Sequence, residues 1–364
     1  SVLIYGNRCH KKRKSGKSEF KKGRWLTMKH GESGAMTQGG KLQLSEDRLF
    51  SSDPVQRGIA RELYAEVSGL PIISPHGHTD PSWFSGNENF GNPTELFLAP
   101  DHYIYRMLYS QGHNLDNLGV PSKAGVPEHD PREAWRLFAN NYHLFRGTPS
   151  RMWLDHVFAN VFGMEERLSA STADSYYDTI DAALKSDAYK PRALFERFNI
   201  EVIATTEGPT DSLEHHEAIL ASGWTGGRVI SAYRPDAVID PEHEQFKGAM
   251  IAFGEITGED VFSWKGYLNA HRQRREDFIG IGTTSSDHGH ITARTADLSD
   301  ADAEHLFLKI VSDDFTAEDA ELFRAQMLTE MARMSLDDGL VLQIHPGAFR
   351  NHNQALFESH GRDK

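Results

Sequence analysis

The chain has 364 residues, of which 38% are hydrophobic and 10% aromatic, so it is long enough for one large core or two medium domains. Its formal net charge of −13 argues against nucleic acid as the main partner. A single cysteine, Cys9, excludes a disulfide within the chain, predicts a cytoplasmic location and leaves histidine and carboxylate as ligands for any metal. Because no run of about 18 apolar residues occurs, we expect no membrane-spanning helix.

The first 35 residues differ from the rest by a strong positive charge. Ten Lys and Arg residues lie there, four of them consecutively at 11–14, and no apolar segment of a secretory signal accompanies them. A targeting or nucleic-acid-binding arm is one interpretation. The other, which we favour, is a disordered or non-native basic leader over residues 1–35, with Met36 as the natural start and the folded part over residues 36–364.

The folded part begins with a helix and a strand. Residues 54–69 carry Ile59, Leu63 and Val67 at four-residue spacing, which is typical of a short amphipathic helix. Residues 71–80 (PIISPHGHTD) then indicate a buried strand with a polar carboxyl end.

A long helical stretch follows this strand. Residues 92–195 are rich in aromatic side chains, for which core packing is the simplest interpretation. The stretch is too long to be one connecting helix. We therefore predict a helical insertion after the first strand.

From residue 195 onward, short apolar strands with polar ends alternate with helical segments. This alternation predicts an α/β fold with a parallel sheet, in which functional residues gather at the carboxyl ends of the strands. Counting the strand at 71–80, five strands are expected. The later strands are expected within 199–211, 226–240, 277–289 and 339–353, and helices at 213–221, 242–253 and 301–335.

The first polar strand end carries His76-Gly77-His78. Side chains two residues apart on a strand point to the same side, so these two imidazoles could hold one metal ion. Gly77 would let the backbone approach closely. The alternative is a pair of loop histidines that hydrogen-bond to backbone.

A second pair, His288 and His290, is a weaker metal candidate. We place the strand before it in the apolar stretch FIGIG (278–282), so that residues 283–287 separate the strand from the pair. For the neighbouring Asp287 we favour a role as a base or as an acceptor from a substrate hydroxyl.

Two further strand ends carry candidate residues. His345 follows the strand LVLQI directly, so it could reach the metal, donate to a substrate oxygen, or simply be a buried histidine. Arg234 follows VISAY, and its planar guanidinium suits a bidentate interaction with a substrate carboxylate. The alternative for Arg234 is an ion pair with Asp236 that fixes the turn.

Two other sites carry less specific signals. His102 and Tyr103 precede a predicted helix, where a neutral imidazole beside a phenol could move protons between adjacent oxygens, although such pairs also pack structurally. Arg350 lies in a polar loop that could orient its neighbours.

Seven motifs occur in order along the chain: PHGHTDP, LAPDHYIYRML, GTPSRMWLDHVF, TTEGPTD, AYRPD, SSDHG and IHPGAFRNHN. As an ordered set they resemble the uronate isomerase (glucuronate isomerase) family of the amidohydrolase superfamily, from about residue 44 to the end of the chain. The resemblance implies a distorted (β/α)8 TIM-type barrel with a helical insertion after its first strand. It also implies interconversion of D-glucuronate with D-fructuronate and of D-galacturonate with D-tagaturonate.

The resemblance also implies roles for seven residues. They would bind a divalent metal, with zinc expected, and a small uronic acid. Stabilising negative charge on a sugar oxygen suits a divalent ion or a histidine. The implied roles are metal ligands for His76 and His78, contact with the reacting oxygens for His102 and Tyr103, carboxylate binding for Arg234, and positions near substrate and metal for Asp287 and His345.

The chain departs from the family at its carboxyl end. The family's final strand supplies an aspartate ligand and a nearby arginine, but this chain stops at Lys364, so we expect about three strand–helix units to be missing. The barrel and its metal site would then be incomplete, with open sheet edges.

Two alternatives to the isomerase are another metal-dependent hydrolase or decarboxylase of the superfamily, and an inactive truncated fragment that binds sugar acids. No lysine ends the strands expected within 199–211, 226–240 or 277–289, which counts against a binuclear hydrolase site. The group that removes the C2 proton stays open among His102, Tyr103, Asp287 and water on the metal, and so does assembly into a homo-oligomer.

Overall fold

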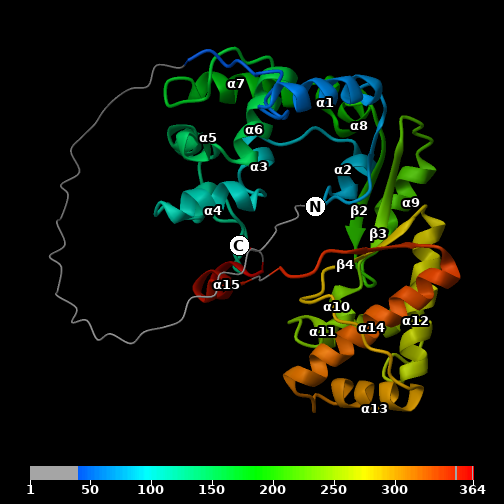
Figure 1. Ribbon diagram of the computed structural model, residues 1–364. Helices are drawn as coiled ribbons and strands as arrows, with labels where there is room; N and C mark the ends of the chain where they lie inside the picture. Colours follow the sequence, from blue (N-terminus) through cyan, green and yellow to red (C-terminus); the bar gives the residue numbers. More distant parts are fainter. Residues whose placement is uncertain (1–39, 349–350, 363) are drawn as a thin grey trace, which may run out of the picture. The chain divides into compact units, whose positions relative to one another are not determined.

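The computed structural model of the protein is shown in Figure 1. The chain divides after Met36 into two units, and the fold below is that of the second unit. The predicted basic leader and Arg350 lie outside the described residues, so their roles stay predictions. The described residues are 40–348, 351–362 and 364.

One five-stranded sheet organises the fold. Its strands lie in sequence order, and each pairs in parallel with the next. The predicted α/β class and parallel sheet are therefore confirmed, while the described residues contribute five strands rather than the eight of a complete barrel. The strands are β1 (Ile72–Ser74), β2 (Ile200–Glu207), β3 (Arg228–Tyr233), β4 (Ser285–His288) and β5 (Val341–Ile344).

The predicted insertion between β1 and β2 is helical. Several of its helices begin with an Asp or Asn side chain that accepts backbone N–H groups, followed by proline, as at Asp80, Asn92 and Asp130. Trp135 and Phe138 are fully buried in the aromatic core. The helices, with α1 preceding β1, are α1 (Pro54–Val67), α2 (Pro81–Gly86), α3 (Pro93–Phe97), α4 (His102–Ser110), α5 (Pro131–Asn141), α6 (Pro149–His156), α7 (Ala173–Leu184) and α8 (Pro191–Arg197).

Helices that connect the later strands build a second core. Tyr233 of β3 packs there with Tyr267 and Phe278, and Figure 1 shows α10 to α14 gathered beside the last strands. The helices of this core are α10 (Asp236–Ile239), α11 (Phe246–Thr257), α12 (Trp264–Gly280), α13 (Asp300–Val311) and α14 (Ala317–Asp338). Helix α9 (Glu214–Ala221) contributes Ile219 to a smaller cluster, and α15 (Gln354–His360) follows β5.

The strand predicted in FIGIG is wrong. The stretch lies at the end of α12 and just after it, because Tyr267, His271, Arg274 and Phe278 recur at helical spacing and are buried together. The strand is the more polar segment SSDH of β4, which is buried along its whole length. Asp287 and His288 are therefore strand residues rather than members of a loop beyond a strand.

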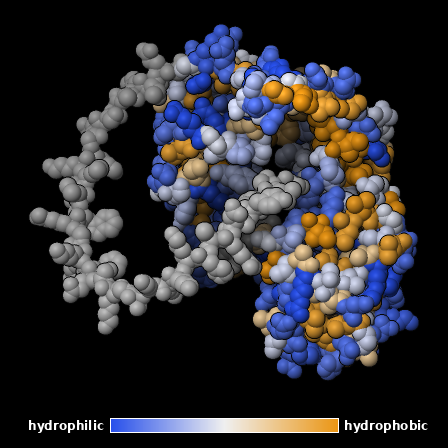
Figure 2. All heavy atoms as spheres, in the orientation of Figure 1, coloured by the Kyte–Doolittle hydropathy of each residue, from blue (hydrophilic) through white to orange (hydrophobic). Residues whose placement is uncertain are grey.

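The prediction that the first strand is buried is also wrong. β1 pairs with β2 alone among the described residues, and Ile72 and Ile73 are 50% and 61% exposed. The amphipathic helix α1 forms as predicted, but no residue in it is buried. Figure 2 shows part of the resulting apolar surface near α1.

None of the helices in the part of the chain that the structure describes combines the length and apolar character needed to cross a bilayer.

Candidate metal centre

Four strand ends bring two imidazoles and a guanidinium together around one buried carboxylate. Asp287 of β4 is fully buried, and its Oδ1 lies 3.3 Å from Nδ1 of His76 and 3.0 Å from Nε2 of His345. Its Oδ2 lies 3.4 Å from Nη1 of Arg234. His76, Arg234, Asp287 and His345 are called the strand-end site below.

Strand alternation explains why these residues meet. Asp287 pairs in register with Gln343, so Asp287 and His345, two residues beyond Gln343, point to the same face. The amide of Gln343 donates to the Pro75 carbonyl at 3.1 Å, which joins the carboxyl ends of β5 and β1. His76 and His345 consequently lie with ring centroids 5.4 Å apart.

Three of these residues fit a divalent metal ion. Ligand atoms from His76, Asp287 and His345 lie within 4.8 Å of one another. Two atoms that each bind one zinc ion at about 2.1 Å in tetrahedral geometry are about 3.4 Å apart, close to the separations from Asp287 Oδ1. This buried oxygen accepts no well-formed hydrogen bond from the described residues, so an ion would supply the partner it needs.

The structure places His78 beside this triad rather than in it. Nε2 of His78 lies 3.2 Å from Nε2 of His76. Burial, and then the neighbouring His76, lower the pKa of His78, which favours a neutral ring that can accept the Nε2–H of His76. That tautomer leaves the lone pair on Nδ1 of His76 facing Asp287. The role of His78 as a metal ligand stays a prediction.

His102 and Tyr103 lie in the first turn of α4, outside the sheet. Their rings pack with centroids 4.2 Å apart, and Tyr103 is 60% exposed. The Asp101 carboxylate accepts the backbone N–H of Tyr103 at 2.8 Å and so caps the helix. The described contacts thus place His102 and Tyr103 in the capped first turn of α4. Their role at the reacting oxygens stays a prediction.

Glu207 also ends a strand, but its carboxylate faces the helices. It accepts hydrogen bonds from the hydroxyls of Thr205 and Ser231, and Nε2 of His216 on α9 lies 3.7 Å away. Burial raises the pKa of Glu207 more than these hydroxyl groups lower it. Sequence position alone could not reveal this orientation, since neighbouring residues on a strand face opposite sides.

His288 and His290 are not part of the strand-end site. His288 is fully buried on the helix side of β4, where its Nε2 lies 3.0 Å from the Ser286 hydroxyl. Burial holds its pKa well below the ordinary value. His290 is 95% buried, and its nitrogens have no hydrogen-bond partner among the described residues. No metal-ligand group in the described chain includes either residue.

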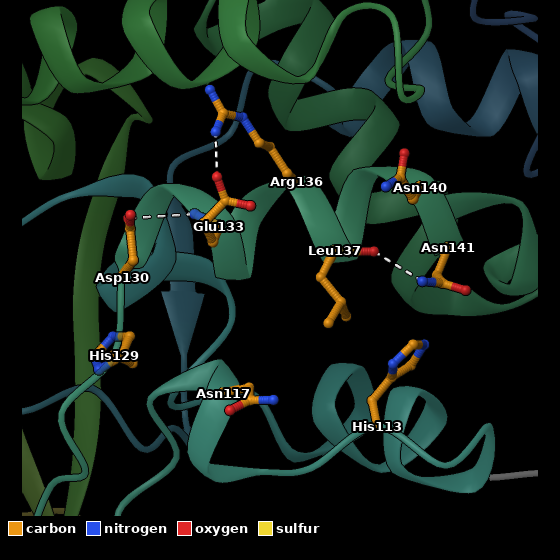
Figure 3. Close-up of a pocket in the computed structure, with 9 residues that line it drawn as sticks. All are labelled: His113, Asn117, His129, Asp130, Glu133, Arg136, Leu137, Asn140 and Asn141. Atoms are coloured by element: carbon orange, nitrogen blue, oxygen red, sulfur yellow. Dashed lines mark hydrogen bonds and ion pairs between the residues drawn. The ribbon is translucent and has the colours of Figure 1, made fainter.

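A cavity of about 430 Å³ lies elsewhere, in the helical insertion beside α5 (Figure 3). Most of its lining residues are polar, and among them Arg136 forms an ion pair with Glu133. The described residues that line the cavity include none that the sequence predicts for the active site. It is therefore distinct from the strand-end site.

Two buried histidines on the helix side of the sheet predict acid sensitivity. Burial lowers the pKa of His216 to about 4 and that of His271 to about 3, against an ordinary value near 6.5. Below pH 6.5 the unfolded chain therefore binds protons that the folded chain does not. The free energy of unfolding should fall as pH drops from 6.5 to about 4, by up to about 1.4 kcal/mol per pH unit for each histidine.

Urea unfolding at pH 7 and pH 5 measures this effect. His271→Asn should reduce the dependence on pH, whereas the exposed control His305→Asn should leave it unchanged. Equal stability of the unaltered protein at the two pH values would contradict the prediction.

The fold and the strand-end site define a parallel α/β protein with a cluster of histidine and carboxylate side chains at the carboxyl ends of its strands. A family model described as glucuronate isomerase matches residues 48–364. The chain belongs to this family of isomerases.

Individual relatives support membership of this family. The uronate isomerase of Phenylobacterium zucineum is 68% identical over 323 residues, covering 89% of this chain and 67% of that protein. The uronate isomerase of Caulobacter vibrioides is 67% identical over 89% of this chain and 66% of that protein. This chain thus spans about two thirds of the length of these relatives.

Solved structures show the same likeness. The crystal structure of glucuronate isomerase from Caulobacter crescentus superposes with a TM-score of 0.87 at 66% identity, covering 89% of this chain and 68% of that one. The uronate isomerase from Thermotoga maritima superposes with a TM-score of 0.79 at 25% identity, covering 88% and 68%.

Proposed function

We propose that the protein is a metal-dependent aldose–ketose isomerase that interconverts D-glucuronate with D-fructuronate and D-galacturonate with D-tagaturonate. One observation carries the proposal: a buried carboxylate, two imidazoles and a guanidinium meet at the strand ends of a chain from the glucuronate isomerase family. In a protein of net charge −13, Arg234 supplies the local positive charge that an anionic sugar requires.

His76, Asp287 and His345 would hold the ion, for which zinc is our choice because nitrogen and oxygen ligands in this number suit it. His78 would either complete the ligand set or orient His76. When bound, the ion supplies stabilisation for negative charge that develops on a sugar oxygen.

The chain's own groups bind the substrate and move protons. Isomerisation transfers a proton from C2 to C1 and another from O2 to O1. We assign the second transfer to His102 and Tyr103 on the strength of their family motif, and substrate orientation to Arg234 through the sugar carboxylate. Water, His102, Tyr103 and Asp287 are the candidates for the C2 base.

The test is ketose formation from D-glucuronate and D-galacturonate, followed by carbon-13 nuclear magnetic resonance, with a panel of cyclic amides and lactones alongside. Ketose formation that stops on chelation and returns with zinc is the expected result. Hydrolysis of the panel without ketose formation would make the protein a hydrolase. Binding without turnover, measured by calorimetry, would make it a sugar-acid-binding protein.

The near absence of cysteine supports the cytoplasm as its proposed location.

A further inference from the structure

Arg234 is held in place by two neighbours, Asp236 and Gly289, to which the family resemblance assigns no role. Its Nε donates to Oδ2 of Asp236 at 2.8 Å, and both side chains are about four-fifths buried, with 20% and 23% exposed. Asp236 spans two strand ends, because its Oδ1 also accepts the backbone N–H of Gly289 at 3.1 Å. One carboxylate therefore fixes the arginine after β3 to the loop after β4.

Gly289 contributes by having no side chain. A Cβ at this position would lie 2.5 Å from Nη2 of Arg234 and 2.6 Å from Oδ2 of Asp236, and 3.1 Å from Cε1 of His345. A Cβ atom essentially never lies within 3.0 Å of such an atom, so the contacts with Arg234 and Asp236 could not persist. Because the nearest atoms are ends of side chains, an added methyl group would displace Arg234 and Asp236 rather than the backbone.

This arrangement selects one edge of the guanidinium. The carboxylate of Asp236 already accepts the Nε–H of Arg234, and Nη1 of Arg234 lies 3.4 Å from the carboxylate of Asp287. A substrate carboxylate could then bind bidentately only through the end formed by Nη1 and Nη2. The direction of approach, and hence the position of the sugar relative to Asp287, depends on how Arg234 is held.

We infer that Asp236 and Gly289 are positioning residues that set the orientation of Arg234 for an anionic substrate. The inference rests on the proposed function for the nature of the substrate, but the orientation of Arg234 is a property of the protein alone. The alternative is that the Arg234–Asp236 pair merely stabilises its turn. Orientation and stability are separable because Gly289→Ala keeps both charged residues in the chain and changes only where their side chains can lie.

The test combines a signal from Arg234 with substrate affinity. The Nε–H resonance of Arg234, assigned as the signal missing in Arg234→Lys, should shift or broaden in Gly289→Ala and Asp236→Ala. Asp236→Asn, which retains an acceptor, should preserve it in part. Calorimetry with zinc-loaded protein and D-glucuronate should show affinity at least about tenfold weaker in Gly289→Ala and Asp236→Ala, equivalent to one 1.4 kcal/mol step.

Matched controls lie at positions outside the strand-end site. Gly248→Ala adds a methyl group in open space on α11, and Asp297→Asn removes an exposed partner of Arg333. Both should leave the Arg234 signal and the glucuronate affinity unchanged.

Three outcomes decide the matter. An unchanged Nε–H signal in both Gly289→Ala and Asp236→Ala would overturn the inference. So would a changed signal with unchanged glucuronate affinity, since the orientation of Arg234 would then be irrelevant to the substrate. If the unaltered protein binds no glucuronate, the proposed function fails, and the Nε–H signal alone decides whether Asp236 and Gly289 position Arg234.

Discussion

Replacing Asp287 with asparagine is expected to weaken zinc binding by about 100-fold or more, beyond the effect usual for residues that only orient a ligand. Asp287 would contribute the anionic ligand of the proposed triad, because its Oδ1 lies 3.3 Å from Nδ1 of His76 and 3.0 Å from Nε2 of His345. Asparagine keeps the volume but replaces the charged oxygen with a weaker ligand. Competition with a chromophoric chelator measures the loss directly and does not depend on turnover.

A comparison of single variants makes this prediction specific to the triad. His76→Gln and His345→Gln should weaken zinc binding as well, whereas Asp313→Asn, which alters an exposed partner of Lys247, should not. His78→Gln distinguishes a metal site that includes His78 as a ligand from one in which His78 only orients His76. A loss as large as that in His76→Gln would make His78 a ligand, and a small loss would give it an orienting role. Zinc affinity unchanged in Asp287→Asn would remove the triad as the metal site.

The strand-end site was predictable to the extent that local rules determine it. Polar residues directly after apolar strands identified His76, Arg234 and His345, because the carboxyl ends of parallel strands meet at one edge. The same rule could not distinguish Asp287, which faces the site, from His288, which faces the helices. That distinction depends on strand register, and the prediction had placed the strand in the end of α12.

The helix before the first strand shows a second limit of prediction from sequence. The spacing of Ile59, Leu63 and Val67 correctly predicted a helix, but these side chains are 55%, 66% and 51% exposed. An amphipathic pattern indicates which face of a helix is apolar. It does not indicate which segment covers that face, because burial depends on tertiary contacts that local sequence does not encode.

The break between α13 and α14 was missed for a related reason. The segment 301–335 was predicted as helical throughout, yet the chain turns at Asp313, whose φ of 61° is left-handed, and restarts at Thr316. Thr316 and Asp319 form a capping box, a local signal that could have located this boundary.

Replacing Arg275 with methionine should lower the free energy of unfolding by about 3 to 5 kcal/mol, the usual result of removing one partner from a buried ion pair. Arg275 of α12 is fully buried, and its guanidinium contacts both carboxylate oxygens of Asp338 at 2.5 and 2.9 Å. It also donates to the Ser335 hydroxyl at 3.0 Å. Methionine fills much of the same volume, so the loss reports the interaction rather than a cavity.

This ion pair also supports the strand that carries His345. Asp338 ends α14, and its Oδ1 accepts the backbone N–H of Leu340 at 3.0 Å, directly before β5. Burial raises the pKa of Asp338. The hydrogen bonds from Arg275 and from the backbone of Leu340, together with the charge of Arg275, lower the pKa by more, so the net shift is downward. The resulting stabilisation is present above the ordinary pKa of the carboxyl group and is lost as pH falls through the folded-state value.

Urea unfolding at pH 7 measures the effect, with Arg272→Met as the control, because Arg272 lies exposed on the same helix. The double variant Arg275→Met/Asp338→Asn keeps an oxygen for Leu340 and removes the uncompensated charge. It should therefore be more stable than Arg275→Met alone. Equal stabilities of Arg275→Met and the unaltered protein would show that the ion pair contributes nothing net. A double variant no more stable than the single one would place the loss in packing rather than in the buried charge of Asp338.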